Sequence, residues 1–295
     1  MDTCMFFQHH RMNDQPFFDQ DLLPYSSLTF RMVQMPGGQF RMGSPEGDPD
    51  AYESEKPRHP VQLDGFWMAE MPVTQALWET VIGNNPSHFK GEQHPVETVS
   101  WFDAAVFCNA LSKMTDRNPR YLTPKSQPYG WDGHKWGLSN EGIVLHDSKT
   151  NGYRMPTEAE WEYAARSPAE EREAGSRSDD SYRYSGSDLL DQVGWYAQNS
   201  GGETHEVGLL LPNAFGLYDM SGNVFEWCED WLGNYTAADQ KNPRGPAEGV
   251  SRVVRGGDWG YDPRRCRPAY RFYGRPGTRD FHLGFRLALS LQSVG

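Results

Sequence analysis

The chain has 295 residues and a formal net charge of −12, with 30 Gly, 21 Pro and 10 Trp. This length suffices for one large or two modest domains, and so many chain-breaking residues exclude a helical bundle. A mean hydropathy of −0.76 and apolar runs well short of about 18 residues predict a soluble protein without a membrane span. The negative charge argues against general nucleic-acid binding. Four Cys without a CxxC pair are too few for a disulfide scaffold.

Residues 1–27 are predicted to form an N-terminal arm, followed by one domain over residues 28–295. The arm has neither a basic start nor a sustained apolar stretch, so it does not match a secretory signal. We therefore expect a cytoplasmic protein whose thiols are reduced. Phe17 and Phe18 are among the aromatic residues that can pack this arm against the domain.

Short strands are predicted where apolar and polar residues alternate. The alternation on both sides of Pro36-Gly37-Gly38 predicts a hairpin, and residues 61–71 predict another strand with a turn at Asp64-Gly65. Further short strands are expected around four positions: Val207, Leu217, Val253 and Phe285.

Three helices are expected, beginning at Thr74, Ser100 and Thr157, and Thr157-x-x-Glu160 matches a capping box. Long irregular stretches at 115–153 and 167–212 separate the elements. The expected fold class is therefore α+β, as a single domain with a high content of coil.

Residues 213–231, NAFGLYDMSGNVFEWCEDW, concentrate oxygen-bearing side chains around Gly222. Five of them fall within twelve positions: Asp219, Asn223, Glu226, Glu229 and Asp230. Hard cations such as calcium bind about six to eight oxygens from carboxylates and carbonyls, and a glycine lets the chain curve around the ion. The alternative is an acidic surface loop in which Asn and Gly serve a turn.

Cys266 is the one residue that the sequence offers as a nucleophile, because no GxSxG, HExxH or P-loop motif is present. It lies among Arg264, Arg265 and Arg267, whose charges are expected to lower the pKa of its thiol. The alternative is a buried structural thiol. No other catalytic residue is assigned.

The C-terminal part differs from the rest of the chain in charge and composition. Eight Arg and three Asp between Arg255 and Arg286 give a local charge of +5, against −17 for the remainder. This asymmetry favours a polar or acidic partner, unless the Arg residues pair with acidic residues elsewhere in the fold. Residues 260–282 also lack Lys, Glu, Gln, Met and Trp, which fill 60 of the 295 positions, so about five would be expected there. Aromatic residues and Arg are typical of binding hot spots, although a structural Arg-rich loop is an alternative.

Seven motifs follow one another along the chain: VQMPGGQFRMGS (33–44), DGFWMAEMPVT (64–74), HPVETVSW (94–101), YRMPTEAEWEYAAR (153–166), NAFGLYDMSGNVFEWCEDW (213–231), RVVRGGDW (252–259) and LGFRLAL (283–289). In this order they resemble the formylglycine-generating enzyme (sulfatase-modifying factor) family over roughly residues 30–290. The resemblance implies a modified C-type-lectin-like core. It also implies calcium, bound by the side chains of Asp219 and Glu226 and the carbonyls of Gly222 and Val224. A second family calcium site would begin near Asn199 and Ser200.

The enzymatic members of that family oxidise a substrate cysteine to formylglycine with a pair of Cys that bind copper. The second Cys of the pair corresponds to Cys266, but the first corresponds to Tyr261, and a family Ser corresponds to Asp258. Soft thiolates select Cu(I), and a single thiolate cannot give paired coordination, so copper is not expected here.

Variable proteins of diversity-generating retroelements share this fold, and the C-terminal segment is most similar to theirs. RGGDW, CRPAYR and GFRLAL frame a variable region at about 258–282. In those systems the adenines of Asn-type codons are randomised while the third base stays a pyrimidine. Such codons cannot encode the five residue types missing from 260–282.

The resemblance therefore implies a non-enzymatic receptor or display protein that binds a protein or other macromolecular ligand. The alternative is a formylglycine-generating-type oxidoreductase, or a degenerate paralogue, acting through Cys266. Scaffold positions include Arg255, Trp259, Cys266 and Arg271. The predicted contact residues are Gly260, Tyr261, Asp262, Arg265, Tyr270, Phe272, Tyr273, Gly274, Asp280, Phe281 and His282.

Overall fold

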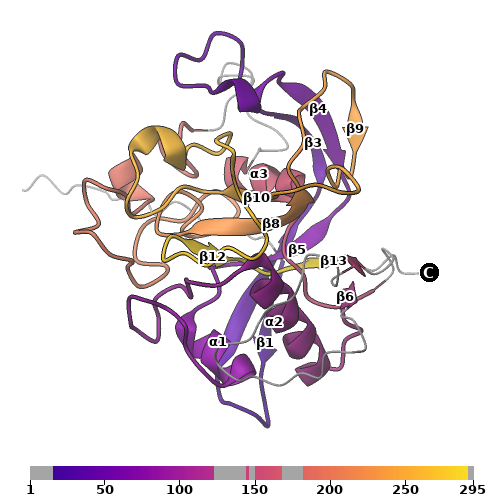
Figure 1. Cartoon of the computed structure of the whole chain (residues 1–295), viewed down its shortest axis with the longest axis vertical. Helices are drawn as coiled ribbons and strands as arrows, with labels where there is room; N and C mark the ends of the chain where they lie inside the picture. Colours follow the sequence, from indigo (N-terminus) through magenta and orange to yellow (C-terminus); the bar gives the residue numbers. More distant parts are fainter. Residues whose placement is uncertain (1–15, 123–143, 146–149, 168–181, 292–295) are drawn as a thin grey trace, which may run out of the picture.

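The computed structural model describes residues 16–122, 144–145, 150–167 and 182–291. Within these ranges the chain forms four small sheets, two of them mixed, and three α-helices joined by long loops, which confirms the predicted α+β class (Figure 1). Much of the stretch at 115–153 and part of that at 167–212 lie outside the described residues. No helix in the described part is long and apolar enough to cross a membrane.

The first sheet is antiparallel and begins inside the predicted N-terminal arm. Its strand order is β1-β2-β5-β13. The four strands are β1 (Phe17–Asp21), β2 (Thr29–Met35), β5 (Phe66–Ala69) and β13 (Ala288–Ser290). Because Phe17 pairs with Val33 and Asp21 with Thr29, residues 17–21 belong to the domain, and the predicted boundary after residue 27 is too late.

The second sheet supports the C-terminal segment. Its order is β11-β10-β8-β12, and β8 runs antiparallel to β10 and parallel to β12. The strands are β8 (Phe225–Trp231), β10 (Arg252–Arg255), β11 (Phe272–Gly274) and β12 (Leu283–Phe285). Every residue of β8 except Trp231 is buried, so β8 forms part of the core and fixes its neighbours.

Two smaller sheets complete the described strands. One combines β3 (Gly38–Met42), β4 (His59–Leu63) and β9 (Gln240–Lys241), and the other combines β6 (Tyr121–Leu122) and β7 (Val144–Leu145).

The hairpin predicted around Pro36-Gly37-Gly38 is wrong, because β2 pairs with β5 whereas β3 pairs with β4. Gly37 has a φ of 79°, and a Cβ there would lie 2.7 Å from the backbone of Asp64 and Gly65. The two turns thus pack against each other where the chain passes from one sheet to the next.

The three helices begin at the predicted caps. They are α1 (Gln75–Ile82), α2 (Trp101–Met114) and α3 (Glu158–Arg166). The side chains of Thr74, Ser100 and Thr157 each accept a hydrogen bond from a backbone amide in the first turn, and the latter two form complete capping boxes. Figure 1 shows α1 and α2 on one side of the sheet containing β8, with α3 on the other.

The strands predicted around Val253 and Phe285 are confirmed as β10 and β12. Those predicted around Val207 and Leu217 are wrong. Both residues are buried in irregular backbone, where the amide of Val207 donates to the carbonyl of Gln93 and that of Asn213 donates to the carbonyl of Leu217. Apolar residues in these loops fill the core without forming a ladder.

Candidate ligand-binding surface

The segment from 256 to 282 leaves β10, passes through a 3-10 helix (Pro263–Cys266) and β11, and returns to β12. Figure 1 shows it in gold and yellow beside β8. Gly257, near the start of this segment, has a φ of 75°, and a Cβ there would lie 2.6 Å from the Sγ of Cys266. The RGG sequence is therefore required for the close packing of this loop on Cys266.

Buried ion pairs hold the segment to the rest of the fold. Arg267 contacts both carboxylate oxygens of Glu55 at 2.8 and 3.0 Å, and Arg255 pairs with Glu162, with both side chains inaccessible to solvent. Removing one partner of such a pair leaves an uncompensated buried charge, which typically costs about 3–5 kcal/mol. These Arg residues are structural, so the predicted excess of positive charge is largely neutralised by acidic residues from upstream elements.

One aromatic cluster forms at the end of the segment. The ring of Trp259 stacks on His282 with centroids 4.6 Å apart and on Phe281 with centroids 5.8 Å apart. Phe89, far upstream, meets Trp259 edge-on at 5.2 Å, and His88 lies 5.5 Å from Phe281. The loop at 84–98 therefore contributes to the same surface as the C-terminal segment.

A second aromatic group surrounds β11. The guanidinium of Arg265 lies 4.1 Å from the ring centroid of Tyr261, within the range of a cation–π interaction. Phe272 is half-buried and stacks on Phe225 at 5.3 Å, whereas Tyr273 beside it is 55% exposed. Successive residues of β11 thus face the core and the solvent alternately, as the geometry of a strand requires.

Asp258 and His282 form an ion pair beneath the first cluster. Asp258 is fully buried, and its Oδ2 lies 3.0 Å from the Nδ1 of His282. Burial raises the pKa of Asp258. Burial lowers the pKa of His282, but the adjacent carboxylate of Asp258 more than offsets this effect, so the pKa of His282 is raised. The protonated imidazole is therefore the form that this site favours.

Cys266 is completely buried, and the expectation that its pKa is lowered is wrong. Burial raises the pKa of its thiol, and the carboxylates of Asp258 and Asp262 act in the same direction. The neighbouring guanidinium groups point away from the Cys266 thiol. That of Arg264, for example, stacks on Tyr52, with its Cζ 3.8 Å from the ring centroid. A neutral, inaccessible thiol is a poor nucleophile.

The predicted calcium ligand Glu226 already has protein partners. Arg286 Nε lies 3.1 Å from both of its carboxylate oxygens, and the indole of Trp161 donates to it at 2.7 Å. Glu226 and Arg286 are both fully buried. Because this guanidinium already neutralises Glu226, the carboxylate does not fit a calcium ion in the arrangement observed.

The other predicted calcium ligands surround the same turn. Asp219 accepts hydrogen bonds from the Gly208 amide at 2.8 Å and from the Asn223 side chain at 3.3 Å. The turn also holds Gly222 and Val224, whose carbonyls were expected as ligands. Nowhere in the described ranges do three or more His, Cys, Asp or Glu side chains form a group that could hold a metal. Calcium at Asp219, Gly222, Val224 and Glu226 therefore stays a prediction.

At the second predicted calcium site, the polar side chains likewise already have hydrogen-bond partners within the protein. The Asn199 side chain accepts a hydrogen bond from the Tyr196 amide at 2.8 Å and donates to the Gly194 carbonyl at 3.0 Å. The Ser200 hydroxyl donates to the Trp259 carbonyl at 2.8 Å. These polar groups stabilise a turn against the base of the aromatic cluster.

A family model described as "Sulfatase-modifying factor enzyme 1-like domain" matches residues 24–291. The chain belongs to this family. Chaperone protein LppX of Paenibacillus barcinonensis is 38% identical over 251 residues, covering 77% of this chain and 78% of that protein. The formylglycine-generating enzyme of Streptomyces coelicolor is 30% identical over 295 residues, covering 87% and 88%. Some relatives are longer, and the chain spans 39% of the serine/threonine-protein kinase pkn1 of Chlamydia pneumoniae.

Among solved structures, Treponema denticola variable protein 1 is similar with a TM-score of 0.80 and 33% sequence identity. The match covers 93% of this chain and 99% of that one. These comparisons confirm the predicted family and the similarity to variable proteins of diversity-generating retroelements.

In this family member, most of the predicted contact residues reach solvent. Gly260, Asp262, Tyr273 and Phe281 are exposed. The partly exposed ones are Tyr261, Arg265, Phe272, Gly274, Asp280 and His282. Gly274 is further restricted by packing, because a Cβ there would lie 2.6 Å from the ring of Trp227.

Tyr270 was predicted to be a contact residue, and this prediction is wrong. It is only 5% exposed, its ring packs 5.2 Å from that of Tyr52, and its carbonyl accepts a hydrogen bond from Arg255 at 2.5 Å. Trp259, assigned to the scaffold, is instead partly exposed within the aromatic cluster. The sequence motifs did not indicate His88 and Phe89, although aromatic residues in a loop between Pro86 and Gly91 are a signal for a contact surface.

Proposed function

We propose that this member of the sulfatase-modifying factor enzyme 1-like family binds a macromolecular ligand through a surface formed mainly by residues 258–282. One observation carries the proposal: within this segment Tyr273 and Phe281 face solvent, whereas Arg267 and Arg271 are buried in ion pairs. Exposed aromatic side chains provide a large contact area at low entropic cost, and the buried pairs keep their backbone in place.

The upstream loop adds rigidity to this surface. Glu97 is fully buried and accepts hydrogen bonds from the Phe89 amide at 2.8 Å and the Thr98 hydroxyl at 2.6 Å. The Thr98 amide donates to the Asp280 carbonyl at 3.0 Å, which joins this loop to the C-terminal segment. A surface fixed before binding loses less conformational entropy when a partner docks, so this arrangement favours binding.

We further propose that the exposed positions are diversified, as in variable proteins of retroelements. Two observations support this: residues 260–282 lack the five amino acids that Asn-derived codons cannot reach, and the fold is similar to that of Treponema denticola variable protein 1. A reverse transcriptase gene and a near-identical, Asn-rich repeat beside the coding region are the expected genomic evidence.

Oxidation of a peptide cysteine through Cys266 is the alternative function. The position of Cys266 in the sequence and the formylglycine-generating relatives favour it. The burial of the thiol and the presence of Tyr261 in place of a second Cys oppose it. An oxygen-consumption assay with copper and a sulfatase-type Cys peptide distinguishes the two functions. We expect no turnover. Turnover that Cys266→Ser abolishes would establish the enzymatic function.

A display experiment tests the binding function directly. One library randomises the solvent-facing Tyr261, Asp262, Arg265, Tyr273 and Phe281, and a matched library randomises buried residues of the same segment: Arg267, Ala269, Tyr270 and Arg271. After selection against a test protein such as lysozyme, we expect folded binders only from the first library. Equal recovery from both libraries, or none from the first, contradicts the proposal.

A further inference from the structure

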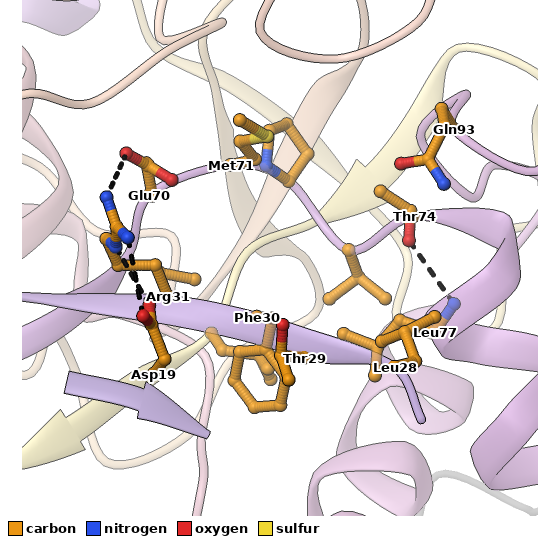
Figure 2. A pocket seen from close by; sticks show the side chains of 14 residues that line it. Asp19, Leu28, Thr29, Phe30, Arg31, Glu70, Met71, Thr74, Leu77 and Gln93 are labelled. Carbon is orange, nitrogen blue, oxygen red and sulfur yellow. Dashed lines mark hydrogen bonds and ion pairs between the residues drawn. The ribbon is translucent and has the colours of Figure 1, made fainter. Parts of the chain in front are cut away.

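A pocket of about 330 Å³ lies on the first sheet, outside the C-terminal segment. It opens between β2, the chain that follows β5 and the start of α1, and none of its lining residues falls in 258–282. Figure 2 shows Asp19, Arg31 and Glu70 at one end and Thr74 and Gln93 at the other. Neither the family motifs nor the proposed function assigns a ligand to this pocket.

The charged end of the pocket has an incompletely satisfied carboxylate. Arg31 is held by Asp19, with Nε 2.8 Å and Nη2 3.3 Å from the two carboxylate oxygens. Glu70 Oε1 lies 3.8 Å from Arg31 Nη1, which is too far for a hydrogen bond. Among the described residues, none donates a hydrogen bond to the Glu70 carboxylate. Asp19, Arg31 and Glu70 together carry a charge of −1, and the charge of the nearby Arg286 is balanced by Glu226, so this end of the pocket attracts a cation.

Burial strengthens the case for Glu70. Its side chain is 22% exposed, and burial raises its pKa although Arg31 acts in the opposite direction. A partly desolvated carboxylate gains most from a donor that carries a positive charge, because such a hydrogen bond is about twice as strong as a neutral one. Arg31 Nη1, the guanidinium nitrogen that Asp19 does not use, lies 3.8 Å from Glu70, so it gives this carboxylate no hydrogen bond in the arrangement observed.

Several apolar side chains line the middle of the pocket. Leu28, Phe30 and Leu77 lie between its polar ends (Figure 2), and Val73 and Leu287 also line the pocket. Val73, Leu77 and Leu287 are core residues, so this wall is fixed. Such a lining suits a hydrocarbon or aromatic group and is unsuited to a hydrated metal ion or a phosphate.

We propose that this pocket binds a small organic cation, in which a primary ammonium group hydrogen-bonds to Glu70 and an aliphatic or aromatic body packs against Phe30 and Leu77. The polar side chain of Gln93 at the far end accommodates a second polar group of the ligand. This site is independent of the macromolecular surface, because the two share no residues.

Phenethylamine is a suitable probe, with 2-phenylethanol and 3-phenylpropanoate as neutral and anionic counterparts of similar shape. Backbone NMR spectra of the full chain report binding at Arg31, Val73 and Leu77. We expect saturable shifts at these amides with the amine, about tenfold weaker binding of the alcohol and none of the anion. Equal binding of amine and alcohol, or the absence of saturable shifts in the pocket, overturns the proposal.

Two variants in the pocket and one control variant outside it locate the site. Glu70→Gln keeps the size of the side chain but removes its charge, and we expect about tenfold weaker binding of the amine. Glu79→Gln, on the exposed face of α1, is the matched control and leaves affinity unchanged. Thr29→Trp, at an exposed position on the rim, narrows the pocket and reduces binding of amine and alcohol alike. Unchanged amine affinity in Glu70→Gln with retained thermal stability excludes this cation site.

Discussion

Arg271, directly before β11, forms a two-point ion pair with Glu158, the first residue of α3. Nε lies 2.6 Å from Oε1 and Nη2 lies 2.8 Å from Oε2, and the side chains are only 3% and 7% exposed. Arg271 also donates to the carbonyls of Ser54 and Gly233. One guanidinium thus joins the proposed binding segment to three parts of the chain that are distant in sequence.

Arg271→Ala should therefore destabilise the protein strongly. It leaves the buried Glu158 with only Arg255, 3.8 Å away, and the Tyr235 hydroxyl as partners, which we expect to lower the free energy of unfolding by about 3 kcal/mol. Arg275→Ala removes the same side chain from an exposed position in the same segment and should change stability by less than about 0.5 kcal/mol. Urea unfolding followed by circular dichroism measures both. Similar losses in the two variants would contradict a structural function for Arg271.

Tyr270 and Tyr273 differ in burial although they are three residues apart. Tyr270→Ala removes a ring packed in the core and should lower the free energy of unfolding by about 3 kcal/mol. Tyr273→Ala removes a ring that is 55% exposed and should cost less than about 1 kcal/mol. Thermal unfolding of the two variants distinguishes a core residue from a contact residue. A large loss for Tyr273→Ala would remove it from the proposed surface.

The buried thiol of Cys266 gives a chemical test. Cys108, Cys228 and Cys266 are all buried, so in a Cys4→Ser background we expect negligible reaction with a thiol reagent in the native state. Reaction of all three should follow only when denaturant unfolds the chain. Mass spectrometry identifies the labelled residue. Rapid labelling of Cys266 in the native protein would support the enzymatic alternative.

Calcium provides a further test at the turn before β8. Because Arg286 already neutralises Glu226, we expect the same melting temperature in excess calcium and in chelator. Differential scanning calorimetry makes the comparison. A calcium-dependent increase in the melting temperature that Asp219→Ala removes would establish the metal site implied by the family, with a rearranged carboxylate.

Local sequence signals were sufficient for the helices but not for the sheets. Thr74, Ser100 and Thr157 were predicted correctly because an N-cap depends on the residues of its own first turn. The alternating pattern around Gly37 correctly indicated strands but not their partners, since β2 pairs with residues 31–37 positions away in β5 and β3 with residues 17–25 positions away in β4.

The candidate surface was predictable where the family motifs fix the backbone. Composition indicated that residues 260–282 are unusual, but it could not show that Tyr270 faces inward, because that depends on contacts with Tyr52 and Arg255. For the same reason, the contribution of Phe89 required the fold. The acidic partners of the Arg residues lie too far away in sequence for any local pattern to reveal them.

The pair formed by His282 and Asp258 predicts a pH dependence of stability. The folded protein holds the pKa of His282 above its ordinary value of 6.5, so between the unfolded and folded pKa values the native state binds more protons. The contribution of His282 is therefore complete below the unfolded pKa and is lost as the pH rises through the folded pKa.

Asp258→Asn removes the largest contributions that raise the pKa of His282 and leaves burial, which lowers this pKa, opposed only by the smaller effects of Asp280 and Glu97. We therefore expect the His282 resonance to titrate at lower pH in this variant. The difference in unfolding free energy between wild type and variant should decrease as the pH rises above 6.5 and through the raised folded pKa of His282. NMR titration and urea unfolding at several pH values measure these effects. An unchanged pKa in Asp258→Asn would show that the carboxylate does not control the charge of His282 beneath the aromatic cluster.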